Sequence, residues 1–270
     1  MNQNIDDIMR DLEQGVAAVF ESDAYRDYLA SLARFHNYSL NNSLLIFRQK
    51  PEATLVAAYG TWRKDFQRSV RRGEKAIRII APVFRRRDEE DERTEGRVIG
   101  YRAVPVFDIS QTEGKPLTAG IIRTPLDTQP PASFLDALLL IAPVPVRFEE
   151  TPGGVNGFYR PIAGDIVISR EMEPVMQVKT LLHEITHAFL HAADDDESKV
   201  ARMRREVEAE SVAFAVSRYY GMDTSSYSLG YIAGWSSTKE MPELKNSLAV
   251  IHSTTGAIIQ KLALVDPALQ

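Results

Sequence analysis

The sequence predicts an α+β protein of two domains, an N-terminal α+β module over residues 1–125 and a C-terminal domain over residues 132–270. Three observations support this prediction. A chain of 270 residues is long enough for two cores. Helical and strand-like patterns of apolar residues occur in both regions. The proline-rich segment Thr124–Pro131 lacks either period, so we interpret it as a linker.

The N-terminal region begins with segments of helical period. Apolar residues over Asn4–Ala33 recur at helical spacing and predict one or two helices. A further helix is expected over Tyr38–Gln49, and a short one over Gly60–Phe66. All three segments precede the strands expected in this region.

Two strands are expected next. Ala76–Phe84 alternates between apolar and polar residues as a strand does, and Gly100–Asp108 is its plausible partner. The charge run over residues 88–95 separates them and is interpreted as a solvated loop of the hairpin. Helices and a hairpin together make the first region an α+β module.

This region also carries an excess of positive charge. Residues 26–87 contain 14 Lys or Arg and four acidic residues, a net charge of +10 in a chain whose total is -5. Aromatic residues are interleaved with these cations. Positive side chains can follow a phosphate backbone, and aromatic faces can stack with unpaired bases. Zinc-finger, basic-zipper and helix-turn-helix patterns for reading a duplex are not evident in the sequence.

Charge clustering selects the residues expected to contact nucleic acid. They are Tyr38, Trp62, Arg63, Lys64, Arg68, Arg71, Arg72, Lys75 and Arg78. The alternative is that the aromatic rings fill the core and the cations form a solvated surface. For Trp62, which Arg63 follows directly, both interpretations stay open. On the first interpretation, residues 1–125 alone are expected to bind single-stranded DNA.

The C-terminal region begins with strand patterns. Val144–Glu150 is expected to be a strand. Phe158–Ile162 and Ile166–Ser169 are expected to pair as a hairpin around the turn at 163–165. A helical apolar pattern follows over residues 175–189 and contains the sequence His-Glu-Ile-Thr-His.

The two histidines of that sequence predict a metal site. His183 and His187 stand four residues apart, so a helix places both imidazoles on one face. Two such nitrogens can bind one Zn²⁺, and Glu184 can accept the proton of an activated water. The alternative is an ordinary helix with two solvated or core histidines.

A third ligand is expected from the next helical segment, Arg204–Tyr220, which contains Glu206, Glu208 and Glu210. Glu208 lies about 200° around the helix from the other two, which are expected to form a solvated acidic face. Glu208 is therefore the expected ligand. His191 is expected to cap the end of the first helix.

The segments HEITHAFLH and EVEAESVAFAV resemble the ImmA/IrrE-type zinc metallopeptidases. The resemblance implies a zincin-like fold in which His183, His187 and Glu208 bind Zn²⁺ and Glu184 is the general base. It also implies that an extended substrate aligns along the edge of the sheet.

The N-terminal region resembles the ArdC-type antirestriction proteins. The resemblance covers NYSLNNSLLIFRQKPEATLVAAYGTWRK, RRGEKAIRIIAPV, GYRAVPVFDISQTEGKPL and, near the C-terminus, DTSSYSLGYIAGW. It implies a single-stranded-DNA-binding domain before a metallopeptidase domain, and protection of mobile-element DNA from restriction during conjugation. Two alternatives stay open: a regulatory zinc protease that cleaves a repressor or host protein, and a DNA-binding protector whose zinc site is inactive or structural.

Composition and sequence patterns also bear on the cellular compartment that we expect. Hydrophobic residues make up 44% of the chain and charged residues 26%, as in ordinary soluble proteins. No membrane-spanning run and no signal-peptide pattern are expected, so the predicted location is cytoplasmic, without a membrane partner. The sequence has no cysteine, so a zinc site must use histidine and carboxylate. The expected partners are single-stranded DNA and, if the peptidase is active, a protein substrate.

Overall fold

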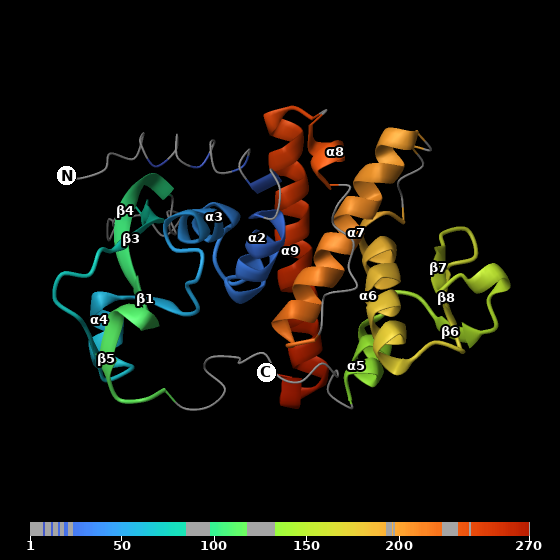
Figure 1. Cartoon of the computed structure of the whole chain (residues 1–270), viewed down its shortest axis with the longest axis horizontal. Helices are drawn as coiled ribbons and strands as arrows, with labels where there is room; N and C mark the ends of the chain where they lie inside the picture. The colour runs from blue at the N-terminus through green and yellow to red at the C-terminus, as the bar shows by residue number, and fades with distance from the viewer. Residues whose placement is uncertain are drawn as a thin grey trace, which may run out of the picture.

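The structure is a computed structural model. It describes residues 8, 12, 16, 19–20, 24–84, 98–117, 133–192, 196, 198–222, 232–237 and 239–269. A helical layer occupies the middle of the molecule, with the N-terminal strands at one end and a small C-terminal sheet at the other (Figure 1). The fold is mixed α and β, as predicted. The expected loop at 88–95 and the expected linker at Thr124–Pro131 lie outside the described residues.

Five helices make up most of the helical layer. They are α2 (Ala24–Arg34), α5 (Phe134–Ile141), α6 (Pro174–Leu190), α7 (Lys199–Tyr219) and α9 (Met241–Val265). The short elements α8 (Ile232–Ser236), η1 (Ile109–Gln111), η2 (Pro152–Gly154) and η3 (Pro267–Leu269) connect or end larger ones. The α7 helix begins at Ser198, whose side chain accepts a hydrogen bond from the Ala201 amide. The expected helices at 175–189 and 204–220 are therefore confirmed as α6 and α7.

The α9 helix departs from the expectation of no membrane-spanning run. By length and composition alone it could cross a membrane. Half of its most apolar stretch is buried inside the protein. The helix packs against α7, α5 and α2, which makes it a core helix of this fold.

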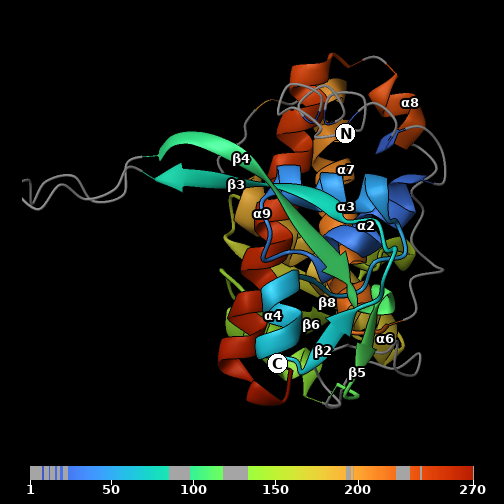
Figure 2. The same cartoon turned by 90° about the vertical axis from the view of Figure 1, so that its left-hand side faces the viewer.

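The N-terminal region forms two small antiparallel sheets. The first has the order β1 (Val56–Ala58), β4 (Val98–Asp108), β3 (Ile77–Phe84), and the second pairs β2 (Arg68–Val70) with β5 (Thr112–Gly114). The expected strand pair is confirmed as β3 and β4, whose register runs from Ile77 opposite Val106 to Phe84 opposite Val98. This hairpin extends away from the helical layer (Figure 2).

The outer edge of β3 is closed by side-chain amides from α3 (Leu40–Gln49). Asn42 accepts a hydrogen bond from the Ile80 N–H at 2.8 Å and donates one to the Ile80 carbonyl at 2.9 Å. Gln49 makes the same pair of contacts with the backbone of Arg78, at 2.8 and 2.9 Å. Unpaired strand edges are liable to associate, and these two amides occupy this one.

The C-terminal sheet has the order β6 (Val146–Glu149), β8 (Asp165–Ser169), β7 (Gly157–Arg160). β7 and β8 form the expected antiparallel hairpin, and its turn contains Gly164 at φ 69°. β6 runs parallel to β8, which the sequence did not indicate. The α6 helix packs against β7 and β8 (Figure 1), and this places the predicted metal helix beside the sheet.

One hydrophobic core crosses the expected domain boundary. It joins residues of α2 and α3 to residues of α6, α7 and α9. The Tyr25 hydroxyl lies 2.8 Å from the Ser211 hydroxyl, and the Phe20 and Trp235 rings are 5.8 Å apart. A second, smaller core lies among α3, β1, β3 and β4. The N-terminal helices therefore pack as part of the helical layer.

Candidate metal centre and nucleic-acid interface

The α6 and α7 helices bring two histidines and one glutamate together. His183 and His187 lie one turn apart on α6, and their Nε2 atoms are 3.0 Å apart. Glu206 reaches both from α7, with Oε2 at 3.5 Å from His183 Nε2 and Oε1 at 3.5 Å from His187 Nε2. Among the described residues, these three form a group whose ligand atoms all lie within 4.8 Å of one another.

The spacing of these atoms fits a small divalent cation. Ligand bonds of about 2.0–2.2 Å in a tetrahedral site separate neighbouring donors by roughly 3.3–3.6 Å. The observed separations of 3.0, 3.5 and 3.5 Å lie close to that range. The residue types, two imidazoles and one carboxylate, are those of a zinc hydrolase site with one position open.

The electrostatic surroundings also favour a cation. Burial alone would lower the pKa of His183, but contacts with Glu206 and Glu210 and the nearby charge of Glu184 outweigh burial and raise it. Burial and the neighbouring His183 lower the pKa of His187. The carboxylates around the histidine pair would therefore also stabilise a bound cation, which takes the place of the proton on a ligand histidine.

Glu184 lies on the same helix and faces the sheet. It is buried, and its Oε2 accepts a hydrogen bond of 2.8 Å from the backbone N–H of Tyr159 in β7. Burial raises the pKa of its carboxyl group. The sheet thus fixes the orientation of the side chain that the sequence predicts to be the general base.

The structure does not bring Glu208 to the histidine pair. Glu208 is buried on another side of α7, where His191 Nε2 lies 3.1 Å from its Oε2 and the Ser247 hydroxyl donates to its Oε1 at 3.0 Å. Glu206 and Glu210, expected on a solvated face, point toward the metal helix instead. Glu210 Oε2 is 3.2 Å from His183 Nδ1.

The expected position of Glu208 differs from the observed one because the sequence does not show which face of α7 meets α6. The 200° separation between Glu208 and the other two glutamates is correct, but residues 207–209 and 211–217 are all buried, so no single apolar stripe marks the side that meets α6. The half-exposed Glu206 side chain, 56% accessible, lies at the open side of the site.

His191 occupies the C-cap of α6, as expected for its position. Its backbone N–H donates to the His187 carbonyl at 2.8 Å. Its side chain does not cap the helix. Instead, its Nδ1 lies 3.0 Å from Nδ1 of His187, and its Nε2 faces Glu208.

In the N-terminal region, Trp62 belongs to the core. Its side chain is fully buried, its Nε1–H donates to the Phe107 carbonyl at 2.8 Å, and its ring packs 4.9 Å from that of Phe66. With no ring surface open to solvent, Trp62 fits the core interpretation and offers no face for a base in this fold. Tyr38 is half-buried, and its hydroxyl donates to the Val56 carbonyl.

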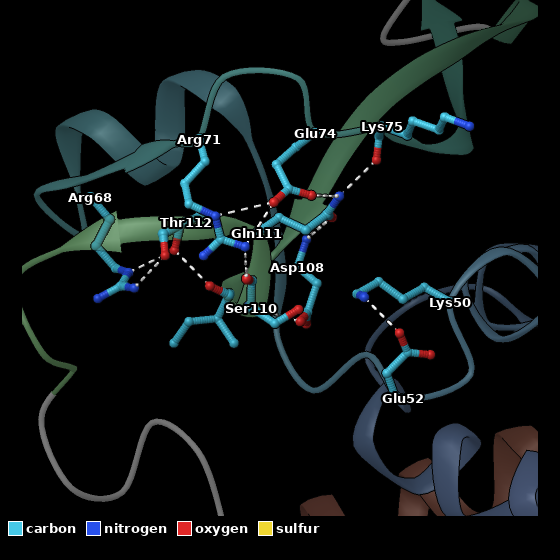
Figure 3. Close-up of polar contacts among 11 residues, drawn as sticks. Lys50, Glu52, Arg68, Arg71, Glu74, Lys75, Asp108, Ser110, Gln111 and Thr112 are labelled. Carbon is cyan, nitrogen blue, oxygen red and sulfur yellow. Dashed lines mark hydrogen bonds and ion pairs between the residues drawn. The ribbon is translucent and has the colours of Figure 1, made fainter.

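Two of the expected DNA-contacting cations are held in a structural network (Figure 3). Arg68 donates to the Thr112 side chain at 2.7 Å and to the Thr112 carbonyl at 3.0 Å. It also donates to the Lys115 carbonyl at 2.7 Å. Arg71 pairs with Glu74 at 2.7 Å and donates to the Ser110 carbonyl at 2.6 Å. These contacts tie β2 to the segment around β5.

The remaining cations that the sequence predicts to contact DNA are at least partly accessible to solvent. Arg63, Lys64, Arg72 and Lys75 are exposed, and Arg78 is half-buried. The most exposed aromatic rings of this region were not among the selected contacts. They are Tyr59, one of the aromatics interleaved with the cations, at 53%, and Phe84 and Tyr101, which the sequence did not single out, at 54% and 60% accessibility. Phe84 and Tyr101 both lie on the extended hairpin (Figure 2), where strand alternation could have suggested their exposure.

Comparison with known families identifies two domains, in the order that the sequence analysis predicts. The family described as the N-terminal domain of anti-restriction factor ArdC matches residues 1–110. The family described as the IrrE N-terminal-like domain matches residues 143–217, which contain the HExxH helix and the glutamate-bearing α7. The protein thus joins an ArdC N-terminal domain to a metallopeptidase-like domain. In its domain content and domain order the chain is an ArdC-type protein.

Individual proteins of similar fold or sequence are also known. The chain is similar to the Mn(II)-bound antirestriction ArdC protein from the R388 plasmid, at 17% identity and a TM-score of 0.57, over 95% of this chain and 97% of that one. The metal-free structure of the R388 protein gives 20% identity and a TM-score of 0.52, over 84% and 86%. An uncharacterized protein of Bacillus anthracis is 26% identical over 86% of this chain. The chain spans about half the length of that relative, 46%.

Proposed function

We propose that this protein binds single-stranded DNA through its N-terminal region and protects mobile-element DNA from host restriction in the cytoplasm. The observation that carries the proposal is the match of residues 1–110 to the ArdC N-terminal domain. The same residues contain exposed aromatic rings and exposed cations. The R388 relative is itself an antirestriction protein of a plasmid. Both support a role in the defence of transferred DNA.

The nucleic-acid surface that we propose consists of the exposed rings and the exposed cations. Tyr59, Phe84 and Tyr101 offer ring faces, and Arg63, Lys64, Arg72 and Lys75 offer charge. Exposed rings stack with unpaired bases, while a duplex keeps its bases stacked on one another. This surface replaces Trp62 with rings that solvent can reach.

Binding assays with the full chain test this surface. Fluorescence anisotropy should give higher affinity for a single-stranded oligonucleotide than for a duplex of equal length. The affinity should fall steeply as salt rises, because bound cations release counterions from the phosphates. Equal affinity for both forms, or affinity independent of salt, would rule out the stacking surface.

We further propose that His183, His187 and Glu206 hold a divalent cation. Two imidazoles and one carboxylate suit Zn²⁺, and the Mn(II) ion in the R388 relative supports a site for a divalent metal. When bound, the ion would act as a Lewis acid and lower the pKa of a water molecule at its open position. The geometry favours Glu206 over Glu208 as the third ligand.

The residues of this chain then suit peptide hydrolysis. Glu184 can accept the proton of the attacking water and pass it to the leaving amine. The Tyr159 N–H holds the Glu184 carboxylate in place by its Oε2, so the carboxylate needs no reorientation between the two transfers. Such fixed positioning is typical of a general base.

Metal analysis of the purified protein tests the site. One zinc ion per chain is expected in the wild type, and His187→Ala should lose stoichiometric binding. Loss of the ion should also lower the melting temperature, because a ligand that binds the folded state stabilises it. A wild-type chain that takes up no divalent cation would remove the metal centre from this proposal.

A regulatory protease is the second candidate function. It is favoured by one observation, the intact Glu184 held beside the histidine pair. Its substrate would be a repressor or another host protein. A protection assay in cells decides between the two: protection that requires Glu184 while DNA binding persists would make proteolysis the operative activity.

A further inference from the structure

We propose that His191, Glu208 and Ser247 form a relay of outer-shell contacts that orients His187 and fixes its tautomer for metal binding. The inference rests on the proposed metal site. The relay runs from His187 Nδ1 to His191 Nδ1 at 3.0 Å, and from His191 Nε2 to Glu208 Oε2 at 3.1 Å. It ends at the Ser247 hydroxyl, which donates to Glu208 Oε1 at 3.0 Å.

Burial gives the relay its strength. His191 is 7% exposed, Glu208 4% and Ser247 2%. A buried carboxylate is costly unless hydrogen bonds satisfy its oxygens. Here each oxygen of Glu208 has a partner, one from α9 and one from the end of α6. Both carboxylate oxygens of Glu208 are therefore engaged in contacts away from the His183–His187 pair.

The proposed relay assigns a direction to each hydrogen bond. A carboxylate oxygen accepts, so His191 Nε2 is the donor to Glu208. An imidazole that donates from Nε2 can accept at Nδ1, so His187 Nδ1 is the donor between the two rings. That tautomer leaves the lone pair of His187 on Nε2, the atom that faces His183 and Glu206.

The relay extends a known arrangement by one residue. Histidine ligands generally donate their second N–H to a carboxylate or a carbonyl, which fixes the ring and raises its basicity. In this protein a second imidazole stands between the ligand and the carboxylate. The relay joins α6, α7 and α9, so the packing of three helices determines the orientation of one ligand.

The two glutamates of α7 thereby have different roles. Glu206, at the open side, completes the ligand group, whereas Glu208, on the buried side, acts through His191. His191 and Glu208 are positioning residues in this scheme. They affect how tightly the cation is held but not how many cations are held.

Metal titration of the full chain separates these roles. Zn²⁺ affinity and stoichiometry are measured by competition with a chromophoric chelator for wild type, Glu208→Gln, His191→Phe and the double variant. Each single variant should still bind one ion, with affinity lower by about 10–100-fold. The double variant should be no weaker than the weaker single variant, because both changes interrupt one relay. Glu206→Ala should instead lose stoichiometric binding.

Two further measurements guard against a merely structural effect. Ser247→Ala keeps the carboxylate and the imidazole and should give a smaller fall in affinity in the same direction. In the zinc-loaded wild type, ¹⁵N NMR of the imidazoles should show the hydrogen of His191 on Nε2, and Glu208→Gln should disturb that signal.

The outcomes divide cleanly. Unchanged affinity in Glu208→Gln and His191→Phe would overturn the relay, as would a His191 hydrogen on Nδ1. Loss of stoichiometric binding in Glu208→Gln, with Glu206→Ala still binding one ion, would make Glu208 the ligand and overturn it as well. Failure of the wild type to bind any cation would instead overturn the metal centre on which the relay depends.

Discussion

At the scale of single residues, Trp62 and Tyr101 are aromatic side chains in opposite environments, one buried and one exposed. Trp62 has no exposed surface and a satisfied indole N–H, whereas Tyr101 is 60% accessible on the hairpin. Trp62→Ala should lower the free energy of unfolding by about 3–5 kcal/mol, as other large buried aromatic truncations do. Urea denaturation followed by fluorescence measures this loss.

Tyr101→Ala should have the opposite profile. Stability should change little, and affinity for single-stranded DNA should fall by about 1–3 kcal/mol, the usual contribution of one stacked base. Tyr101→Phe is the matched control, because it keeps the ring face and should keep the affinity. A Trp62→Ala protein that weakens DNA binding at wild-type stability would return the stacking role to Trp62.

Glu184 permits a second prediction at this scale. Glu184→Gln keeps the size of the side chain and removes the proton acceptor, so metal content and fold should persist while any peptide cleavage is lost. Single-stranded-DNA affinity and protection should be unchanged, because the proposed DNA surface lies on other residues. Zinc analysis, a peptidase assay and a protection assay on the same variant provide the comparison.

The sequence was informative about residues where the signal is local. Helical period alone brings His183 and His187 together, since four residues make about one turn. The third carboxylate depends on which face of α7 meets α6, and that choice is made by packing among three helices. Trp62 was ambiguous because an aromatic residue beside cations suits both a core and a stacking surface.

At the scale of elements, the contact between α3 and the edge of β3 depends on two amides. Asn42→Ala removes both hydrogen bonds to Ile80 and should destabilise the protein by about 1–3 kcal/mol, with the N-terminal sheet affected first. Its neighbour Asn41 is exposed, so Asn41→Ala is the control and should be close to neutral. Hydrogen exchange of the β3 amides would locate the effect, and equal losses in both variants would argue against it.

Gly157 marks a close approach between β7 and α6. A Cβ at this position would lie 2.9 Å from the Val167 carbonyl oxygen and 2.8 Å from Thr180 Cγ2. Gly157→Ala should therefore displace β7, weaken the Tyr159 contact with Glu184 and cost about 1–3 kcal/mol of stability. Gly60→Ala, in a helix with open space around it, should be neutral or slightly stabilising, and thermal melts compare the two.

The elements with a regular apolar period were predicted well. β3 alternates over Ile77–Ile80, and the apolar residues of α6 repeat at helical spacing. Two of the features that were not predicted show why. The parallel pairing of β6 with β8 joins segments separated by a hairpin strand, and no local pattern specifies it. α9 was absent from the expected elements because polar residues interrupt its apolar period, although Thr254 and Thr255 are buried.

At the scale of the whole molecule, the shared core changes what the N-terminal region can do alone. Residues 1–125 were expected to act as a separate DNA-binding unit. In the structure, α2 and part of α3 bury their apolar faces in the helical layer with α7 and α9. A fragment of residues 1–125 would expose these faces to water.

We therefore expect the full chain to unfold in a single transition and the fragment to be less stable and prone to aggregate. Calorimetry of the full chain and circular dichroism of the fragment measure this. If the fragment of residues 1–125 is soluble and melts at the same temperature as the full chain, the N-terminal region folds independently.

The placement of α2 also bears on how such proteins could exchange parts during evolution. A recombination point between the two family regions, near residue 125, would separate helices that share one core. Two points, one just after Gln49 and one near residue 125, would keep α2 and α3 with the metal-bearing half, at the cost of the amide contacts to β3, and would transfer the strands between them as a unit. Hybrids made at these two points should inherit the nucleic-acid preference of the donor and the metal chemistry of the recipient.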